Sequence, residues 1–222
     1  MKPDIAIVGI GETPAVRKSG RDIQSMALDA IFAALDDAKI IIEEEVATLR
    51  RLVGEFSSFA KLPEPQLEHA DLAEFATDAM KSLSIEHGDG HALHVRLDAP
   101  SERVPVNIDA MMLKRCVDNL VRNAAQALKN ANVAQAQIEI RVRRENHDAV
   151  LEVSDNGPGV PEDARARVFE PYYTTKADGT GLGLAIVKKI VLEHGGEISY
   201  APSKTGGACF RIALPLLRNE VA

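Results

Sequence analysis

The chain has 222 residues, which is long enough for one sizeable domain or two small ones. Hydrophobic residues make up 45% of it, so a packed core can form, and scattered basic residues within a net charge of −7 exclude an extended surface for nucleic acid. Two cysteines, Cys116 and Cys209, indicate no disulfide framework. We find no membrane-spanning run and no signal peptide, so we expect a cytoplasmic chain and leave open a membrane anchor on a longer parent.

The first 65 residues are predicted to be mainly helical. Residues 4–8 indicate a short strand, and a helical stripe of apolar residues begins near residue 19. Residues 40–62 continue with an amphipathic pattern that stops before Pro63, because proline cannot extend a helix. One helix over residues 20–61 can therefore form. A helix that long usually packs against a partner helix, so a homodimer through it is one expectation.

The remaining residues, 66–222, are predicted to form one domain in which helices and strands alternate. Asp71 is a candidate cap for the first helix, and two glycines after His194 end the last one. The pattern is typical of an α+β fold, a two-layer α/β sandwich with helices on one face of a sheet. We expect helices over residues 72–83, 109–129 and 182–194, strands over 91–98, 104–107, 136–144, 149–154, 197–201 and 208–214, and a long loop over 156–180.

Two asparagines lie one turn apart on the predicted helix of residues 109–129. Asn119 and Asn123 share one face, because residues four apart are neighbours on a helix surface. Carboxamides there can orient a metal-bound phosphate. Taken alone, the pair is better explained as ordinary surface amides.

Two glycine-bearing turns follow along the chain. Asp155 ends a predicted strand and is followed by Gly157 and Gly159, so its carboxylate can accept a hydrogen bond from a ligand amine that approaches the backbone closely; a plain turn is the alternative. A second run opens a helix, where backbone N–H groups can bind phosphate. It matches neither a Walker loop nor a dinucleotide fingerprint. The run consists of Gly179, Thr180, Gly181, Leu182, Gly183 and Leu184.

The order of these motifs carries more weight than any one of them. The Asn-xxx-Asn helix, the Asp-x-Gly-x-Gly turn, the Phe-Glu-Pro-Tyr-Tyr segment of residues 169–173 and the Gly-x-Gly-x-Gly helix start resemble the N, G1, F and G2 boxes of sensor histidine kinases. That family shares its ATPase fold with gyrase and Hsp90. Residues 55–63 also resemble the end of the dimerisation helix in nitrogen-regulation sensor kinases. The resemblance implies a catalytic ATP-binding domain over 66–222, preceded by the remnant of a dimerisation helix and linker over 40–65.

The resemblance implies ATP and Mg²⁺ as cofactors. Asn123 would hold Mg²⁺ against the phosphates with Asn119 beside it, and Asp155 would bind the adenine amine. Gly157 and Gly159 would allow the adenine to approach the backbone.

The resemblance also implies a mobile lid over residues 172–178. The glycine run of residues 179–184 would shape the loop on the phosphate side, and Lys176 in the lid would reach a phosphate. Arg122 is left open between a phosphate contact and solvent.

Asn119 distinguishes two kinds of enzyme. Hydrolytic relatives resembling gyrase carry a glutamate at this position as a base for water, whereas an amide cannot take a proton at neutral pH. Phosphoryl transfer to another acceptor is therefore favoured over hydrolysis.

The histidines do not supply the expected phosphoacceptor. None of the six stands before an acidic residue on an upstream helix, so transfer would occur in trans, to a histidine-bearing dimerisation domain that in turn serves a response regulator. Residues 1–39 instead resemble the start of thiolase-family enzymes, without their active-site motifs, and this indicates a fusion, natural or engineered.

Four hypotheses follow. The chain phosphorylates a histidine on another chain; it binds nucleotide without turnover; it hydrolyses ATP, against which Asn119 argues; or it acts as a helix-mediated dimerisation protein, which is compatible with the first two.

Overall fold

The computed structural model describes residues 63–83, 93–176 and 179–217, with Phe32, Lys39, Glu43 and Val46 besides. The chain divides into two compact units, Met1–Ala60 and Lys61–Ala222, and the described ranges lie in the second. The predictions for residues 1–39 and for a helix over 20–61 fall outside the described residues. None of the described helices is long and apolar enough to cross a membrane.

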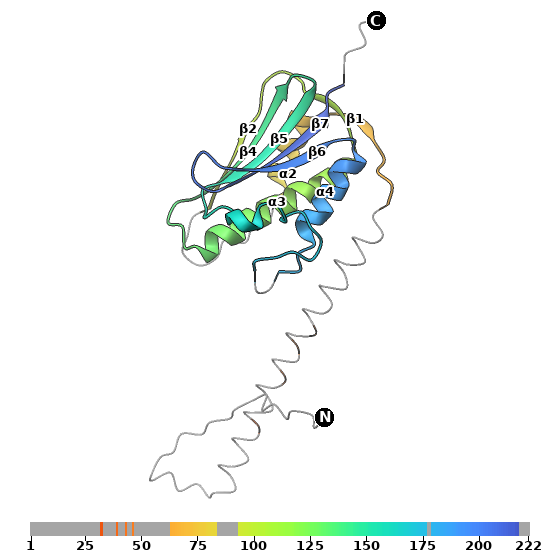
Figure 1. The fold of residues 1–222 in the computed structure, drawn as a ribbon. Coiled ribbons are helices and arrows are strands. Elements are labelled where there is room, and N and C mark those ends of the chain that lie inside the picture. The colour runs from red at the N-terminus through yellow and green to blue at the C-terminus, as the bar shows by residue number, and fades with distance from the viewer. Residues whose placement is uncertain are drawn as a thin grey trace, which may run out of the picture. The chain divides into compact units, whose positions relative to one another are not determined.

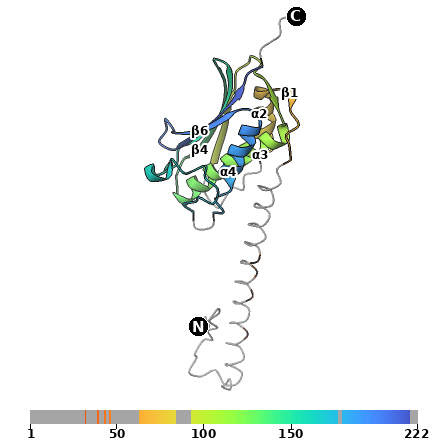
Figure 2. The same ribbon diagram turned by 45° about the vertical axis from the view of Figure 1, so that its right-hand side comes forward.

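The second unit is a two-layer sandwich in which three helices cover one face of a five-stranded sheet, as expected (Figures 1 and 2). The strand order is β2-β4-β5-β7-β6; β2 runs parallel to β4, and the other neighbours are antiparallel. The helices are α2 (Leu72–Lys81), α3 (Ala110–Asn130) and α4 (Gly183–Glu193), and the strands of this sheet are β2 (Leu93–Asp98), β4 (Ala136–Glu145), β5 (Asp148–Asp155), β6 (Glu197–Pro202) and β7 (Ala208–Pro215). A short 3₁₀ helix, Glu162–Ala164, interrupts the predicted loop.

The core forms where the apolar face of the sheet packs against the apolar stripe of a helix, as β4 and α3 illustrate. Along β4 the buried positions alternate, and the apolar side chains of α3 recur every three or four residues on one stripe. The two patterns face each other. The buried apolar residues of β4 are Ala136, Ile138, Ile140 and Val142, and those of α3 are Met112, Leu113, Cys116, Val117, Leu120, Val121, Ala124 and Leu128.

A small second sheet was not predicted. β1 (Glu68–Asp71) pairs antiparallel with β3 (Pro105–Ile108), so His69 lies in a strand rather than in the linker that the sequence indicated. The strand has four residues, three of them polar or charged, and its only apolar residue is an alanine. Such a segment carries no apolar alternation, and its pairing with β3 decides its structure.

Aspartates cap two of the helices: Asp71 was predicted to do so, whereas Asp109 was predicted as the first residue of its helix. Asp71 accepts a hydrogen bond from Ala73 N at the start of α2, and Asp109 accepts from Met111 N and Met112 N at the start of α3. Burial by itself would raise the pKa of Asp109, but the hydrogen bonds from Met112, Gln66 and Met111 outweigh it and lower that pKa. Each cap therefore fixes a helix end against the sheet or the incoming chain.

His194 is buried and links the start of α3 to the end of α4. Its Nε2 accepts from Asp109 N at 3.0 Å, and its Nδ1 lies 2.8 Å from Ile190 O, so this pair of contacts requires the tautomer with the proton on Nδ1. The sequence assigned it only a helix-capping place. The contact holds the two helices that carry the candidate site in a fixed relation.

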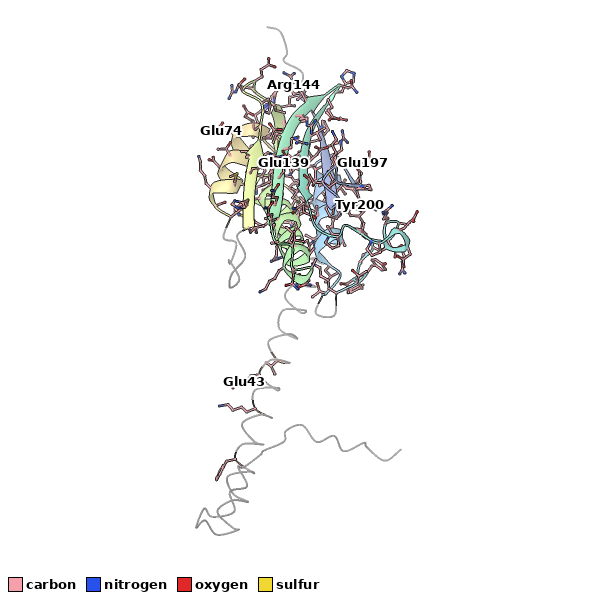
Figure 3. All side chains as sticks on the ribbon, turned by 90° about the vertical axis from the view of Figure 1, so that its left-hand side faces the viewer. Glu43, Glu74, Glu139, Arg144, Glu197 and Tyr200 are labelled. Atoms are coloured by element: carbon pink, nitrogen blue, oxygen red, sulfur yellow. The ribbon has the colours of Figure 1, made fainter. Side chains whose placement is uncertain are left out.

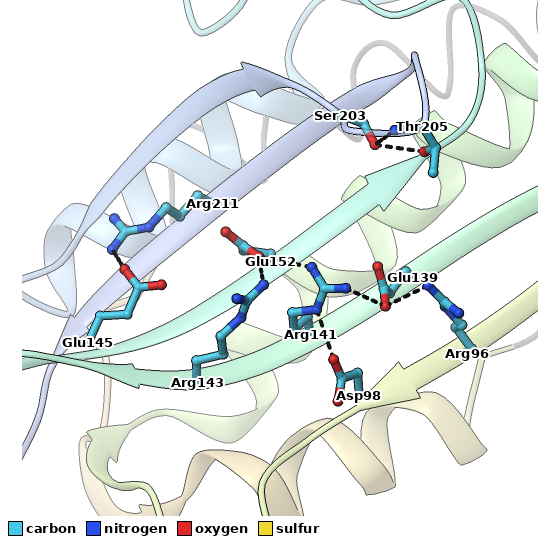
Figure 4. Close-up of polar contacts among 10 residues, drawn as sticks. All are labelled: Arg96, Asp98, Glu139, Arg141, Arg143, Glu145, Glu152, Ser203, Thr205 and Arg211. Atoms are coloured by element: carbon cyan, nitrogen blue, oxygen red, sulfur yellow. Dashed lines mark hydrogen bonds and ion pairs between the residues drawn. The ribbon is translucent and has the colours of Figure 1, made fainter.

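The open face of the sheet is covered by paired charges (Figures 3 and 4). Arg141 on β4 lies at the centre, 2.9 Å from Asp98 on β2 and 2.7 Å from Glu139 on its own strand. Glu152 on β5 continues the row through Arg143 at 3.0 Å. Such partly exposed pairs contribute little stability each, but they make this face soluble without helices over it.

Candidate functional site

The predicted amide pair lies where α3 meets the start of α4. Asn119 is buried and Asn123 is half-buried. An ideal Cβ built on Gly183 would lie 3.3 Å from Asn119 Oδ1 and 3.9 Å from Asn123 Nδ2, so the first residue of α4 approaches both amides. The structure thus brings together two motifs that are about 60 residues apart in the chain.

Both amide oxygens receive cationic donors. Arg122 donates from Nη2 to Asn119 Oδ1 at 2.7 Å, and Lys176 donates from Nζ to Asn123 Oδ1 at 3.2 Å. Burial, with Arg122 nearby as a second cause, lowers the pKa of Lys176. The sequence left Arg122 undecided, and the structure places its guanidinium on the amide side of the helix. Two positive groups therefore gather where the phosphates are predicted to bind.

The glycine-rich run is hydrogen-bonded to the segment that precedes it in the chain. Tyr172 N donates to Gly181 O at 3.0 Å, which joins the run to the Phe-Glu-Pro-Tyr-Tyr segment. Gly181 has φ +68°, and an added Cβ would collide with the backbone of Tyr172. Leu182 is buried and anchors the glycine-rich run to the core, while Leu184 is only half-buried.

The N-terminus of α4 is open to a ligand. Unlike α2 and α3, it receives no side-chain cap from the described residues, and the residue before it is the apolar Leu182. Free N–H groups and the positive end of the helix dipole favour phosphate. This end of α4 is the part of the run that points toward Asn119 and Asn123.

Asp155 ends β5, and the residue is only 6% exposed. Its Oδ1 accepts from Gly157 N at 2.8 Å and from Ala208 N at 3.3 Å, and the described residues supply no hydrogen bond to Oδ2. One oxygen is thus fixed by the backbone, and the other is left for a donor. Burial raises the pKa of Asp155, although the hydrogen bonds from Gly157 and Ala208 act in the opposite direction.

The turn between β6 and β7 contacts Asp155 through both a hydrogen bond and close packing. Thr205 Oγ1 donates to Asp155 O at 3.2 Å. A Cβ on Gly207 would collide with both Asp155 O and Oδ1, so only glycine fits there. Gly159, with φ +73°, packs against the carbonyl of Gly207. The absence of a side chain at Gly159 therefore allows close packing against this turn, in addition to any contact that it makes with a ligand.

Helix α3 connects the two halves of the site. A Cβ on Gly157 would lie 3.5 Å from Leu128 Cδ2, which places the turn after Asp155 against the later part of this helix. Asn123 is five residues earlier, or about 7.5 Å along the axis. A ligand with a flat polar ring at one end and phosphates at the other matches this separation.

The donor set also fits Mg²⁺ bound together with phosphate. Magnesium takes oxygen ligands and commonly combines one or two protein oxygens with phosphate oxygens. Asn123 Oδ1 already accepts from a cation, the Lys176 ammonium, at 3.2 Å. In the described residues no three His, Cys, Asp or Glu side chains gather into an all-protein metal site.

Comparisons with known proteins agree with this geometry. A family model described as "Histidine kinase-, DNA gyrase B-, and HSP90-like ATPase" matches residues 108–218. The nitrogen regulation protein NtrY of Azorhizobium caulinodans is 34% identical over 81% of this chain and 23% of its own length. The sensory histidine kinase/phosphatase NtrB of Rhodobacter capsulatus is 30% identical over 99% of this chain and 60% of its own length. The chain therefore spans less than two thirds of either relative.

Comparison with solved structures also finds histidine kinases. The mycobacterial sensor histidine kinase MprB is 28% identical with a TM-score of 0.55, covering 68% of this chain and 97% of that one. The catalytic domain of the histidine kinase ThkA is 26% identical with a TM-score of 0.56, covering 68% and 96%. The family model matches half of the chain and takes in the amide helix, Asp155 and the glycine-rich run. The chain therefore belongs to the histidine kinase-, DNA gyrase B- and HSP90-like ATPase family.

Proposed function

We propose that residues 66–222 bind Mg·ATP and transfer its γ-phosphoryl group to a histidine on another chain of a two-component system. The observation that carries this proposal is the buried Asp155 carboxylate, in which Oδ1 accepts backbone hydrogen bonds and Oδ2 receives none from the described residues. The same site, along α3, contains Asn123, Arg122 and Lys176. The names of the relatives, which are sensor kinases, support the transferase reading.

Adenine binding follows from the two oxygens of Asp155. Oδ1 is held by two backbone N–H groups, so Oδ2 is oriented to accept a hydrogen bond from the exocyclic amine of adenine. Gly157 leaves the approach clear, because a Cβ there would lie 2.9 Å from Oδ1. A base that presents a carbonyl instead of an amine at this position would place an acceptor against a carboxylate, so the site favours adenine.

The phosphates are expected to bind at the amide side. Arg122 and Lys176 supply positive charge, and the start of α4 supplies N–H groups. Asn123 Oδ1, with Asn119 beside it, would hold the Mg²⁺ that neutralises charge on the phosphates. In the transfer, the bond from the γ-phosphorus to the bridging oxygen of ADP breaks, a bond from an imidazole nitrogen to phosphorus forms, and ADP leaves with the electron pair.

Hydrolysis is not favoured by the same site. Asn119 donates to Arg115 O at 3.0 Å and accepts from Arg122. Its carboxamide is not basic enough to take a proton from water at neutral pH. We therefore place this chain with the transferases of its family.

The acceptor is expected to come from a partner. Of the histidines, His69 lies in β1, His94 in β2, His147 in the turn after β4, and His194 is buried. His87 and His91 lie outside the described residues. We propose a cytoplasmic site of action, a histidine-bearing dimerisation domain as the direct partner, and a response regulator as the next acceptor.

A transfer assay tests the proposal. The purified chain is mixed with γ-labelled ATP, Mg²⁺ and the separately purified dimerisation domain of a nitrogen-regulation sensor kinase. We expect acid-labile, base-stable label on that domain only when this chain is present. Nucleotide binding without label on the acceptor would favour a module without turnover, and release of free phosphate without the acceptor would favour a hydrolase.

Mild acid is expected to weaken nucleoside binding. The adenine amine needs the ionised form of Asp155, whose pKa burial raises above the ordinary value of 3.8, so the carboxylate is lost at a higher pH than usual. Adenosine is the suitable probe because it has no titrating phosphate. Its affinity should fall as the pH is lowered from neutral through that raised pKa, and the Asp155→Asn variant should show no such trend.

A further inference from the structure

Two hydroxyl groups of the β6–β7 hairpin hold the segment that begins at Asp155. At one end of this segment, Thr205 Oγ1 donates to Asp155 O at 3.2 Å. At the other end, the phenol oxygen of Tyr200 on β6 accepts from Val160 N at 3.3 Å. The two contacts join residues that are 50 and 40 positions apart in the chain. The folded hairpin therefore helps to set where the segment over residues 155–160 lies.

The Thr205 hydroxyl is held in place by a second hydroxyl of the same turn. Ser203 Oγ lies 2.8 Å from Thr205 Oγ1 and also accepts from Thr205 N at 3.3 Å (Figure 4). Thr205 gives its only hydroxyl proton to the carbonyl of Asp155, so Ser203 must donate in the contact between the two hydroxyls. Ser203 N in turn donates to Gly207 O at 2.8 Å, which closes the turn. A continuous chain of hydrogen bonds thus runs from the turn to the backbone of Asp155.

Tyr200 is held by the packing of its ring. The ring centroid lies 5.6 Å from that of Phe210, which is buried on β7. Phe210 stands opposite Val153 in the sheet, two residues before Asp155 on β5. A tyrosine ring packed on one side can present its oxygen to a polar partner at the other end. The oxygen of Tyr200 is therefore in a defined place when it accepts from Val160 N.

We infer that Thr205 and Tyr200 are positioning residues for base recognition: they fix the segment over residues 155–160, and with it the direction of Asp155 Oδ2. The inference rests on the proposed function, because it takes Asp155 as the group that binds the adenine amine. A hydrogen bond weakens steeply as its angle departs from the favoured range, so a small rotation of the carboxylate weakens the contact with the base. The phosphates are proposed to bind at Asn123 and the start of α4, where neither hydroxyl makes a hydrogen bond.

Removing either hydroxyl tests this role. ADP and inosine diphosphate carry the same phosphates, but the base of inosine has a carbonyl where adenine has the amine. Thr205→Val keeps the shape of the side chain and should lower the affinity for ADP about three- to tenfold, while the affinity for inosine diphosphate stays within about twofold. Tyr200→Phe should act in the same direction. Isothermal titration in Mg²⁺ measures both affinities for each variant.

Two further variants control for general damage to the turn. Thr205→Ser retains the hydroxyl and should keep the preference for ADP, and Lys204→Ala, at an exposed position of the same turn, should leave the ratio of the two affinities unchanged. Equal losses of ADP and inosine diphosphate binding in Thr205→Val and Tyr200→Phe, or an unchanged preference for ADP in both, would overturn the positioning role alone. A parent chain that binds neither nucleotide, or both equally well, would contradict the proposed adenine site and the positioning role with it.

Discussion

Replacing Asp155 by asparagine is expected to lower the affinity for ATP by about two orders of magnitude. The amide oxygen of asparagine would take the place of Oδ1 and accept from Gly157 N and Ala208 N. Its NH₂ group would then face the adenine amine, donor against donor, in a site that is nearly closed to water. Losing a charge-assisted hydrogen bond and leaving a buried donor unpaired each cost about 1–3 kcal/mol. Calorimetric titration measures the change.

A matched control lies on the same strand. Asp148 begins β5, at the opposite end from Asp155, and is half-buried. Asp148→Asn should leave ATP affinity unchanged, and both variants should keep the thermal transition of the parent chain within a few degrees. An Asp155→Asn affinity within twofold of the parent value would refute the adenine-binding role.

Replacing Asn123 by alanine is expected to abolish most of the gain in affinity that Mg²⁺ gives. The variant loses the oxygen proposed to hold the metal and also the 3.2 Å contact to Lys176, so metal-free nucleotide should bind about as well as before or slightly better. We expect the Mg²⁺-dependent part of the affinity to fall about tenfold or more. Titrations with ATP analogue in Mg²⁺ and in EDTA separate the two parts.

Asn130→Ala is the control for this change, because Asn130 ends the same helix and is exposed. It should alter neither affinity. Equal losses with and without Mg²⁺ in Asn123→Ala would show that Asn123 supports the fold of the site rather than the metal.

Most helices and strands of residues 66–222 were predictable, since their causes are local. Asp71 and Asp109 cap helices through their own neighbours, β4 alternates between buried and more exposed residues, and β5 follows it after a short turn. β1 was not predictable, because a four-residue polar strand has no pattern of its own and depends on β3. The boundaries of the other elements shifted by one or two residues.

The candidate site could likewise be predicted only in part from the sequence. The sequence named Asn119, Asn123 and the glycine run, and the structure brings them together at the start of α4. It did not indicate that the turn at Gly207 holds Asp155, because that contact depends on the antiparallel register that sets Ser154 opposite Cys209. The contact of Lys176 with Asn123 likewise joins residues that are far apart in the chain, whereas Arg122 contacts Asn119 within the same helix.

Calorimetric titration of the purified chain with a non-hydrolysable ATP analogue, with and without Mg²⁺, is the most direct test of nucleotide binding at this site. We expect saturable binding at one site, tighter with Mg²⁺ than in EDTA and lost in Asp155→Asn. No binding by the folded chain in either buffer, or binding that is unaffected by both Mg²⁺ and the Asp155 substitution, would contradict it.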